Sequence, residues 1–228
     1  KAKRKVMAEK AWLSFLPFII SARFRWNTRI TRIRLSMDKF LICGLGNPGD
    51  EYQGTRHNTG WMALDACAKA MGAEWHDRRY GFVAETSLKG RKVFLLKPTT
   101  FMNLSGNAVR YWLNEERIDQ SRLLVISDDV ALPLGEFRLK AGGSNGGHNG
   151  LGDIIQLIGE HYARLRIGIG NDYPRGGQID WVLGHYSATD METLQPTLDL
   201  SVDIVKSFVL QGIGETMNQF NKLGKHKK

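Results

Sequence analysis

Cysteine is scarce in this chain. Cys43 and Cys67 are the only two among 228 residues, and they lie too far apart to form a Cys-x-x-Cys motif. Their number excludes a disulfide scaffold and a zinc site recognisable from the sequence, and it fits a reducing compartment such as the cytoplasm. Cys43 falls in an apolar run and Cys67 on an apolar helical stretch, so we expect both thiols in the core.

Long apolar runs are also missing. A spanning helix needs roughly 17–25 residues, whereas the run at residues 11–20 has only ten, so we expect no membrane anchor. The run follows a basic start, as in a secretory signal, but the arginine-rich stretch after it opposes export. Scarce acid and frequent arginine also fit a transit peptide. We favour a segment upstream of a natural start at Met37, because a compact fold pattern begins there. We therefore predict a basic N-terminal extension at residues 1–36, outside the fold, and one domain at residues 37–228.

Acidic residues are almost absent from that extension. The whole chain has 32 Lys+Arg, 23 Asp+Glu and a net charge of +9. Residues 1–36 contain ten of the basic residues and a single acid, Glu9, so they account for the entire excess. Four more lysines fall in the last seven residues, and the body between them is slightly acidic. The net charge therefore does not indicate a basic nucleic-acid-binding domain, and any RNA contact must come from a local patch.

The body alternates between strand and helix patterns. The hydrophobic content of 42% and charged content of 24% are ordinary for a globular protein. Apolar runs predict strands at residues 40–45, 81–88, 92–96, 123–126, 135–140 and 165–169. Helical spacing predicts helices at 61–71, 105–113, 150–158 and 187–211, with Pro196 either in the first turn of the last helix or breaking it. We therefore predict a single α/β domain in which a twisted mixed β-sheet is packed between α-helices, a three-layer αβα arrangement.

A glycine-rich motif, Gly44-Leu-Gly46-Asn47-Pro-Gly49, follows the first predicted strand. It matches the G-x-G-x-x-G pattern of dinucleotide-binding proteins, in which a helix opens at the third glycine with its N–H groups toward the pyrophosphate. Here further glycines interrupt the following segment, and the expected acid near Asp65 falls inside a helix instead of after a second strand. A tight turn is therefore favoured over nucleotide binding, with the amide of Asn47 available to point outward.

A candidate general base lies in the loop that follows. His57, in the segment TRHNTG, can accept a proton near neutral pH, as a general base must. Asp128 and Asp129 follow the buried strand at 123–126, at the sheet edge where α/β proteins place their sites. One of these acids could orient the His57 ring and stabilise its protonated form. The alternative is that the two acids cap a turn and that His57 is structural.

Two other loops supply polar groups. Asn103, in KPTTFMNLSG, could close an Asx-turn or offer its amide N–H to a developing oxyanion. The segment from Lys140 to Gly150 is rich in glycine and precedes a helix, so it could accept a phosphate or approach a ligand closely, although it lacks the ending of a P-loop. His148 within it is the one rival base, because the remaining histidines have no comparable setting.

The sequence assigns neither a covalent nucleophile nor a metal site. No serine or cysteine is predicted to act as a nucleophile, and no cluster shows metal-ligand spacing. A hydrolase built from these residues would use a histidine-activated water and amide donors, with no covalent intermediate, and we expect no cofactor. They do not identify the substrate.

Five segments together carry a resemblance. GLGNPGDEYQGTRHNTG, KPTTFMNLSG, DD-x3-PLG, GGSNGGHNGLGDII and RLRIGIG, in this order and spacing, resemble the bacterial-type peptidyl-tRNA hydrolase family from about Met37 to the C-terminus. The resemblance implies an enzyme that hydrolyses the ester between a peptide, or an N-blocked amino acid, and the 3′ end of tRNA, releasing tRNA for reuse in translation. It also implies a monomeric, metal-free, cytoplasmic protein whose partner is the acceptor stem and 3′ end of peptidyl-tRNA.

The resemblance assigns roles to five catalytic candidates. It makes His57 the base that deprotonates water and Asp128 the acid that orients it. Asn103 would hold the peptidyl end and stabilise the tetrahedral intermediate, and Asn149 would place the water and contact the substrate. Asn47 would discriminate a blocked aminoacyl group from a free one.

Four further residues are implied in tRNA binding. By the same resemblance, Tyr52 and Phe101 would line the site for the tRNA end. Lys140 and Arg166 would clamp tRNA phosphate, where charge attraction supplies affinity with little sequence readout.

The chain departs from the family pattern beside the site. Ser127 stands where members often have histidine, Ala131 where aspartate is frequent, and Ser144-Asn145 where the family is more glycine- and histidine-like. These departures bear on rate and pH optimum more than on reaction type. The alternative hypothesis, a non-catalytic RNA-binding homologue of the same fold, is opposed by the intact His, Asp and Asn set.

Overall fold

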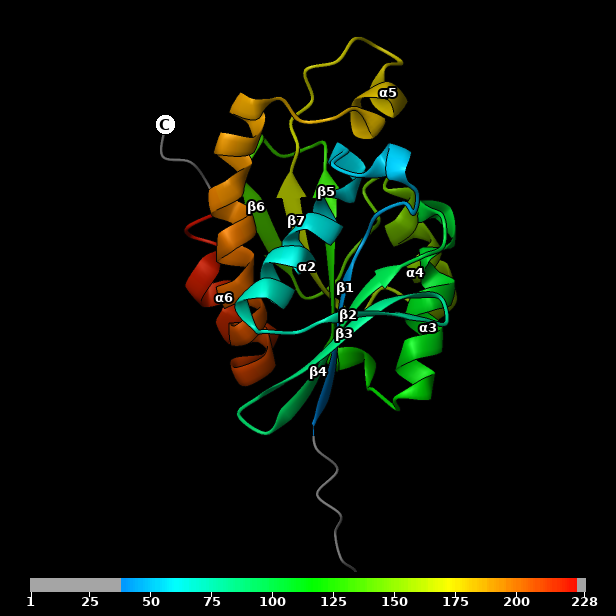
Figure 1. The fold of residues 1–228 in the computed structure, drawn as a ribbon. Coiled ribbons are helices and arrows are strands. Elements are labelled where there is room, and N and C mark those ends of the chain that lie inside the picture. Colours follow the sequence, from blue (N-terminus) through cyan, green and yellow to red (C-terminus); the bar gives the residue numbers. More distant parts are fainter. Residues whose placement is uncertain (1–37, 225–228) are drawn as a thin grey trace, which may run out of the picture. The chain divides into compact units, whose positions relative to one another are not determined.

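A seven-stranded mixed sheet forms the middle layer of the fold (Figure 1). The computed structural model describes residues 38–224, so the predicted extension at residues 1–36 lies outside the described residues. The strands are β1 (Lys39–Gly44), β2 (Trp75–Arg78), β3 (Gly81–Leu88), β4 (Arg91–Pro98), β5 (Leu123–Asp129), β6 (Phe137–Lys140) and β7 (Ala163–Gly168). Their order is β2-β3-β4-β1-β5-β7-β6. The pairs β4–β1, β1–β5 and β5–β7 are parallel, and β2–β3, β3–β4 and β6–β7 are antiparallel.

Side chains on the central strand β1 alternate between two hydrophobic cores. Phe40 and Ile42 face the core shared with α2 (Thr59–Ala70) and α6 (Ala188–Phe220), while Leu41 and Cys43 face the one shared with α3 (Ser105–Glu115) and α4 (Asn149–Ile158). This is the period-two alternation of a strand that is covered on both faces, and it explains why β1 is apolar throughout. The three-layer α/β prediction is confirmed, and Cys43 and Cys67 are buried free thiols as expected.

The last helix, α6, extends beyond the predicted stretch at 187–211. It begins after Ser187, which forms a capping box with Asp190. The prediction for Pro196 is wrong, because this residue lies inside the helix and the helix continues past it. Burial of Leu194 and Leu198 on either side of Pro196 outweighs the lost backbone hydrogen bond. The interruption comes instead at Gly212, whose φ of 80° is open to glycine.

Several short elements are missing from the sequence prediction. They are strand β2, helix α5 (Gln178–Leu183) and the 3₁₀ helices η2 (Asp50–Tyr52), η3 (Arg56–Asn58), η4 (Met102–Leu104) and η5 (Gln120–Arg122). Segments this short do not span enough residues to show a period. Four of them, η2, η3, η4 and α5, nevertheless carry residues of the candidate site. Within residues 38–224, none of the helices combines the length and apolar character that a bilayer span requires.

The carboxyl ends of three parallel strands meet at one edge of the sheet. Asn47 follows β1, η4 follows β4, and Asp128 lies at the end of β5. Because β1 pairs in parallel with both β4 and β5, these three segments are brought to the same edge. This is the position at which open α/β sheets hold ligands.

Candidate active site

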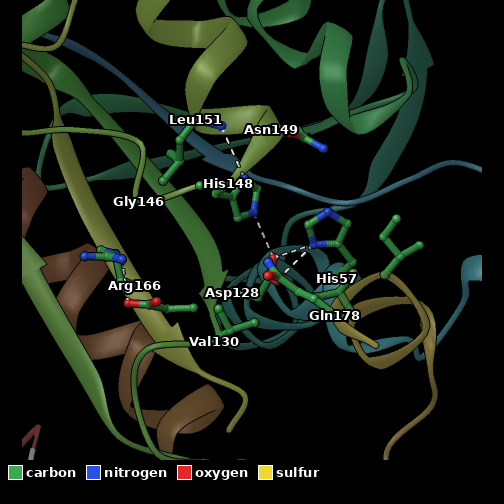
Figure 2. Close-up of a pocket in the computed structure, with 13 residues that line it drawn as sticks. His57, Asp128, Val130, Gly146, His148, Asn149, Leu151, Arg166 and Gln178 are labelled. Atoms are coloured by element: carbon green, nitrogen blue, oxygen red, sulfur yellow. Dashed lines mark hydrogen bonds and ion pairs between the residues drawn. The ribbon is translucent and has the colours of Figure 1, made fainter. Parts of the chain in front are cut away.

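A histidine and an aspartate are paired at this edge. The His57 Nδ1 atom lies 3.0 and 2.9 Å from the two carboxylate oxygens of Asp128 (Figure 2). Both side chains are almost entirely buried, with exposed fractions of 11% and 3%. A carboxylate can only accept, so Nδ1 carries the proton and Nε2 is left with its lone pair. Figure 2 shows the second ring nitrogen of His57 turned away from the carboxylate, as a general base requires.

The pair shifts both pKa values. Burial alone would lower the pKa of His57, but the charge and hydrogen bond of Asp128 outweigh burial and hold the pKa above its ordinary value of 6.5. Burial alone would raise the pKa of Asp128, but contacts with His57 and His148 hold it well below its ordinary range. Asp128 is therefore ionised at neutral pH, beside an imidazole whose protonated form it stabilises.

A second histidine, His148, contacts the same carboxylate. Its Nδ1 accepts the backbone N–H groups of Gly150 and Leu151 at the start of α4, at 3.1 and 3.3 Å. A nitrogen that accepts carries no proton, so the ring proton is on Nε2, which donates to Asp128 Oδ1 at 2.9 Å. His148 thus has no nitrogen left to take a proton from water. The sequence weighs it as a rival base, whereas the structure gives it the roles of helix cap and donor to Asp128.

The three side chains also form the one cluster of possible metal ligands among the described residues. Ligand atoms of His57, Asp128 and His148 lie within 4.8 Å of one another. The hydrogen bonds do not fit a metal, because binding at His148 Nε2 would move its proton to Nδ1, against two backbone donors. The cluster is better described as a hydrogen-bonded network around one carboxylate.

Asn47 joins two loops of the site. Its backbone N–H donates to Asn58 Oδ1 at 2.8 Å, and Asn58 Nδ2 donates back to the Asn47 carbonyl at 3.0 Å. The Asn47 side-chain oxygen accepts the backbone N–H of Met102 at 2.8 Å. This bond fixes the orientation of the side chain, and Asn47 Nδ2 has no hydrogen-bond partner among the described residues, so its N–H is open to a ligand.

Asn103 and Asn149 belong to different helices, η4 and α4, which are in contact. A Cβ atom on Gly150 would come within 2.6 Å of Met102 Sδ, so the start of α4 touches η4 and no larger residue fits there. Met102 precedes Asn103 and Gly150 follows Asn149, so the contact holds the two asparagines on adjoining segments. Both asparagines are exposed. Asn149 lines the cavity at His57 and Asp128, and Asn103 lies on η4, which the start of α4 contacts.

A cavity of about 280 Å³ opens at the His57–Asp128 pair. Among its lining residues are the predicted His57, Asp128, Asn149 and Arg166 (Figure 2). Helix α5 supplies Gln178, Ile179 and Val182, which the sequence prediction missed because α5 is too short to show a period. Asn47, Asn103, Tyr52, Phe101 and Lys140 do not line this cavity.

The predicted tRNA-binding residues differ in setting. Phe101 is 55% exposed just before η4, and Tyr52 is half-buried at the end of η2. Arg166 Nη2 lies 2.9 Å from Asp129 Oδ2, so its charge is already partly compensated. Lys140, at the end of β6, makes no ion pair within residues 38–224. The register of β6 on β7 places it on the same face of the sheet as Arg166.

The departures from the family pattern surround the network. Ser127 is fully buried beside Asp128, and the Ala131 backbone N–H donates to Asp129 Oδ1 at 2.9 Å. The Ser144 carbonyl accepts from Arg164 at 2.7 Å, and the Asn145 carbonyl accepts the His148 N–H at 3.1 Å. None of them removes a contact of the His57–Asp128 pair.

The G-x-G-x-x-G motif has a packing role. A Cβ on Gly44 would lie 2.2 Å from the Gly60 carbonyl oxygen, and one on Gly46 would lie 2.6 Å from the Trp61 ring, so these glycines let α2 approach the end of β1. After the motif come η2 and η3, and α2 starts only at Thr59. The helix that a pyrophosphate needs at the third glycine is therefore not there.

A family model, similar curated proteins and a similar crystal structure all carry the same description. A family described as peptidyl-tRNA hydrolase matches residues 41–228. A peptidyl-tRNA hydrolase of Bacteroides fragilis is 58% identical over 185 residues, 81% of this chain and 99% of that protein, and one of Phocaeicola vulgatus is 57% identical over the same shares. The crystal structure of peptidyl-tRNA hydrolase from Acinetobacter baumannii is 36% identical, with a TM-score of 0.77 over 81% of this chain and 96% of that one.

Proposed function

The chain belongs to the peptidyl-tRNA hydrolase family, and from this premise we propose that His57 and Asp128 drive its hydrolysis of the ester between a peptide and the 3′ end of tRNA. The alternative of a non-catalytic RNA-binding homologue is not supported, because the similar curated proteins are named as hydrolases. The observation that carries the proposal is the buried His57–Asp128 pair, with its free imidazole nitrogen beside a cavity.

Water is the proposed nucleophile. His57 Nε2 takes a proton from a water molecule as the water oxygen attacks the ester carbonyl, and Asp128 stabilises the imidazolium that forms. The tetrahedral intermediate then collapses, the ribose 3′ oxygen leaves, and His57 returns the proton to it. General-base assistance of this kind contributes roughly 10²–10⁴ in rate.

The three asparagines are proposed as amide donors. Asn103 holds the peptidyl end and donates to the developing oxyanion, and Asn149 places the water and contacts the substrate. Asn47 presents an N–H because the bond from Met102 to its oxygen fixes the orientation of the amide. This N–H can donate to the carbonyl of a blocked amino group. It cannot bond to a free ammonium, which has only donors. This supports its role in selecting blocked substrates.

The tRNA is proposed to contact two aromatic side chains and two basic side chains of the protein. The exposed Phe101 ring offers a stacking surface to the tRNA end, and Tyr52 is proposed to contact the same end. Lys140 and Arg166 attract the acceptor-stem phosphates, with Lys140 the stronger because Asp129 already pairs with Arg166. We further propose that the enzyme acts as a cytoplasmic monomer and uses no cofactor.

The deciding experiment is a hydrolysis assay on N-blocked aminoacyl-tRNA, with and without a chelator. We expect release of free tRNA at equal rates in both arms. Absence of hydrolysis would contradict the function, and loss of activity in the chelator arm alone would contradict a metal-free mechanism.

A further inference from the structure

The three residues of η3 are each bound to a different part of the molecule. His57 is bonded to Asp128 on β5, and Asn58 exchanges two hydrogen bonds with Asn47 after β1. Arg56 is bound to the segment that joins α5 to α6 and to the first turn of α6. The first two anchors belong to the site already described, whereas the role of the third has not been assigned.

Arg56 is held at both its backbone and its side chain. Its backbone N–H donates to the Gly184 carbonyl at 2.9 Å. Its Nη1 donates to the His185 carbonyl at 2.8 Å, and its Nη2 donates to Asp190 at 3.1 Å. The guanidinium lies over the Trp181 ring, 4.0 Å from the centroid. For an arginine, an exposed fraction of only 8% indicates a side chain fixed in one place.

Trp181, on which the Arg56 guanidinium lies, belongs to the helix that forms one wall of the cavity. Trp181 belongs to α5, and its neighbours Gln178 and Val182 line the cavity at His57. The Trp181 indole N–H donates to the Gly170 carbonyl at 3.0 Å, so the ring that Arg56 covers is itself fixed to the chain after β7. A shift of Arg56 would therefore move His57 and loosen the α5 wall together.

We propose that Arg56, clamped between Trp181 and Asp190, is a positioning residue that holds the His57 imidazole on Asp128 in the geometry needed for water activation. The proposal rests on the proposed function of His57. Arg56 touches neither the reacting atoms nor Asp128. It acts because a 3₁₀ turn of three residues has little internal rigidity and takes its orientation from its outside contacts. Small misplacements of a catalytic group are costly, up to about 10² in rate for 1 Å.

Arg56→Lys is the informative variant, because it keeps the positive charge and removes the planar fork. An ammonium cannot bond two acceptors and stack on an indole at once as the guanidinium does. The other charged or titratable groups around His57 and Arg56 are not substituted: Asp128 and Asp129 on β5, His148 before α4, Arg166 on β7, Tyr186 before α6 and Asp190 in α6. A change at His57 then reports its geometry and not a lost charge.

The first measurement is steady-state hydrolysis of N-blocked aminoacyl-tRNA across pH. For Arg56→Lys we expect kcat to fall by roughly 10–100-fold with little change in KM. We expect the acidic limb of the rate profile to move to lower pH, because a loosened contact with Asp128 stabilises imidazolium less. Arg110→Lys, at an exposed arginine on α3, is the matched control and should behave as wild type. A lower kcat with an unmoved limb would indicate only a structural defect and would overturn the proposal.

The second measurement does not depend on activity. NMR titration of the His57 ring in folded wild-type and Arg56→Lys proteins should show a lower pKa in the variant. Equal pKa values would overturn the positioning role even if hydrolysis fell. If wild type failed to hydrolyse the substrate while the His57 shift was still seen, the proposed function would fail and the positioning role would stand.

A double-mutant cycle tests the clamp itself. Trp181→Leu removes the ring on which Arg56 lies, so it should lower kcat as Arg56→Lys does. The two changes together should cost less than the product of the single effects, because both disrupt one contact. Fully multiplicative effects would show that Trp181 and Arg56 act separately and would contradict the clamp.

Discussion

His148 Nε2 donates a hydrogen bond of 2.9 Å to the same Asp128 oxygen that lies 3.0 Å from His57 Nδ1. One carboxylate thus accepts from two imidazoles, and the two rings are not equivalent. The other nitrogen of His148 accepts two backbone N–H groups at the start of α4, while the other nitrogen of His57 has no partner among the described residues. The asymmetry identifies which histidine can work as the base.

Removal of the second histidine should reduce the rate without abolishing it. His148→Ala takes one donor from the buried Asp128 and the cap from α4, so we expect slower hydrolysis and a loss of about 1 kcal/mol of stability, typical for an N-cap. Single-turnover rates and thermal unfolding measure the two effects. A variant as inactive as His57→Ala would instead give His148 a direct part in proton transfer.

His57→Ala should abolish hydrolysis of N-blocked aminoacyl-tRNA and largely preserve tRNA binding. The side chain supplies the only free imidazole nitrogen of the network within the described residues, but it is almost buried and offers phosphates no exposed charge. Hydrolysis and filter binding on the same preparations separate the two effects. Near-normal hydrolysis would remove His57 from the mechanism.

Asp128→Asn should lower the rate by roughly 10³–10⁴ with little loss of folding. An amide can donate to His57 Nδ1 and so move the ring proton to Nε2, where a base needs its lone pair. The measurement is kcat with circular dichroism as the folding control. Unchanged kinetics would show that Asp128 does not orient the base.

The pH profile should carry the signature of the pair. A base must be neutral, so kcat/KM rises as pH rises through the pKa of His57. Because that pKa is held above 6.5, we expect the limb of the wild-type profile above this value. In Asp128→Asn the residual activity should show its limb at lower pH, because the anion that stabilises imidazolium is gone.

The sequence predicts the fold well wherever a period is long enough to see. The strand at 81–88 and the start of the helix at Ser105 agree with the structure, because alternating and helical patterns extend over whole elements there. The pairing of His57 with Asp128 follows from the resemblance and from the rule for strand ends, although 71 residues separate them. The tautomer of His148 could not be predicted, because it depends on two backbone donors that are in place only once α4 has formed. The anchoring of Arg56 likewise depends on α5, which has no readable period.

The salt dependence of tRNA binding should distinguish the two predicted phosphate-binding residues, Lys140 and Arg166. Lys140→Ala should weaken tRNA binding and reduce the slope of log K against log salt by about 0.7–0.9, the loss of one phosphate contact. Arg166→Ala should have a smaller effect, because Asp129 already neutralises part of its charge. Asp129→Asn is the matched control and should tighten binding through the released Arg166. Unchanged slopes in both alanine variants would place the phosphate contacts elsewhere.

Selection of blocked substrates should depend on the N–H of Asn47. Asn47→Asp keeps an oxygen for the Met102 N–H and replaces the amide donor by an acceptor with negative charge. The new carboxylate should repel the carbonyl of a blocked amino group and attract a free ammonium. The ratio of kcat/KM for N-acetylaminoacyl-tRNA to that for free aminoacyl-tRNA should therefore fall, by about tenfold or more if one charge-assisted hydrogen bond of about 1.5–3 kcal/mol changes sides. Asn47→Ala removes the donor without adding charge, and it also leaves the Met102 N–H without its partner. If Asn47→Asp slows both substrates equally, as loss of the loop contact alone would, Asn47 positions the loop and does not choose between substrates.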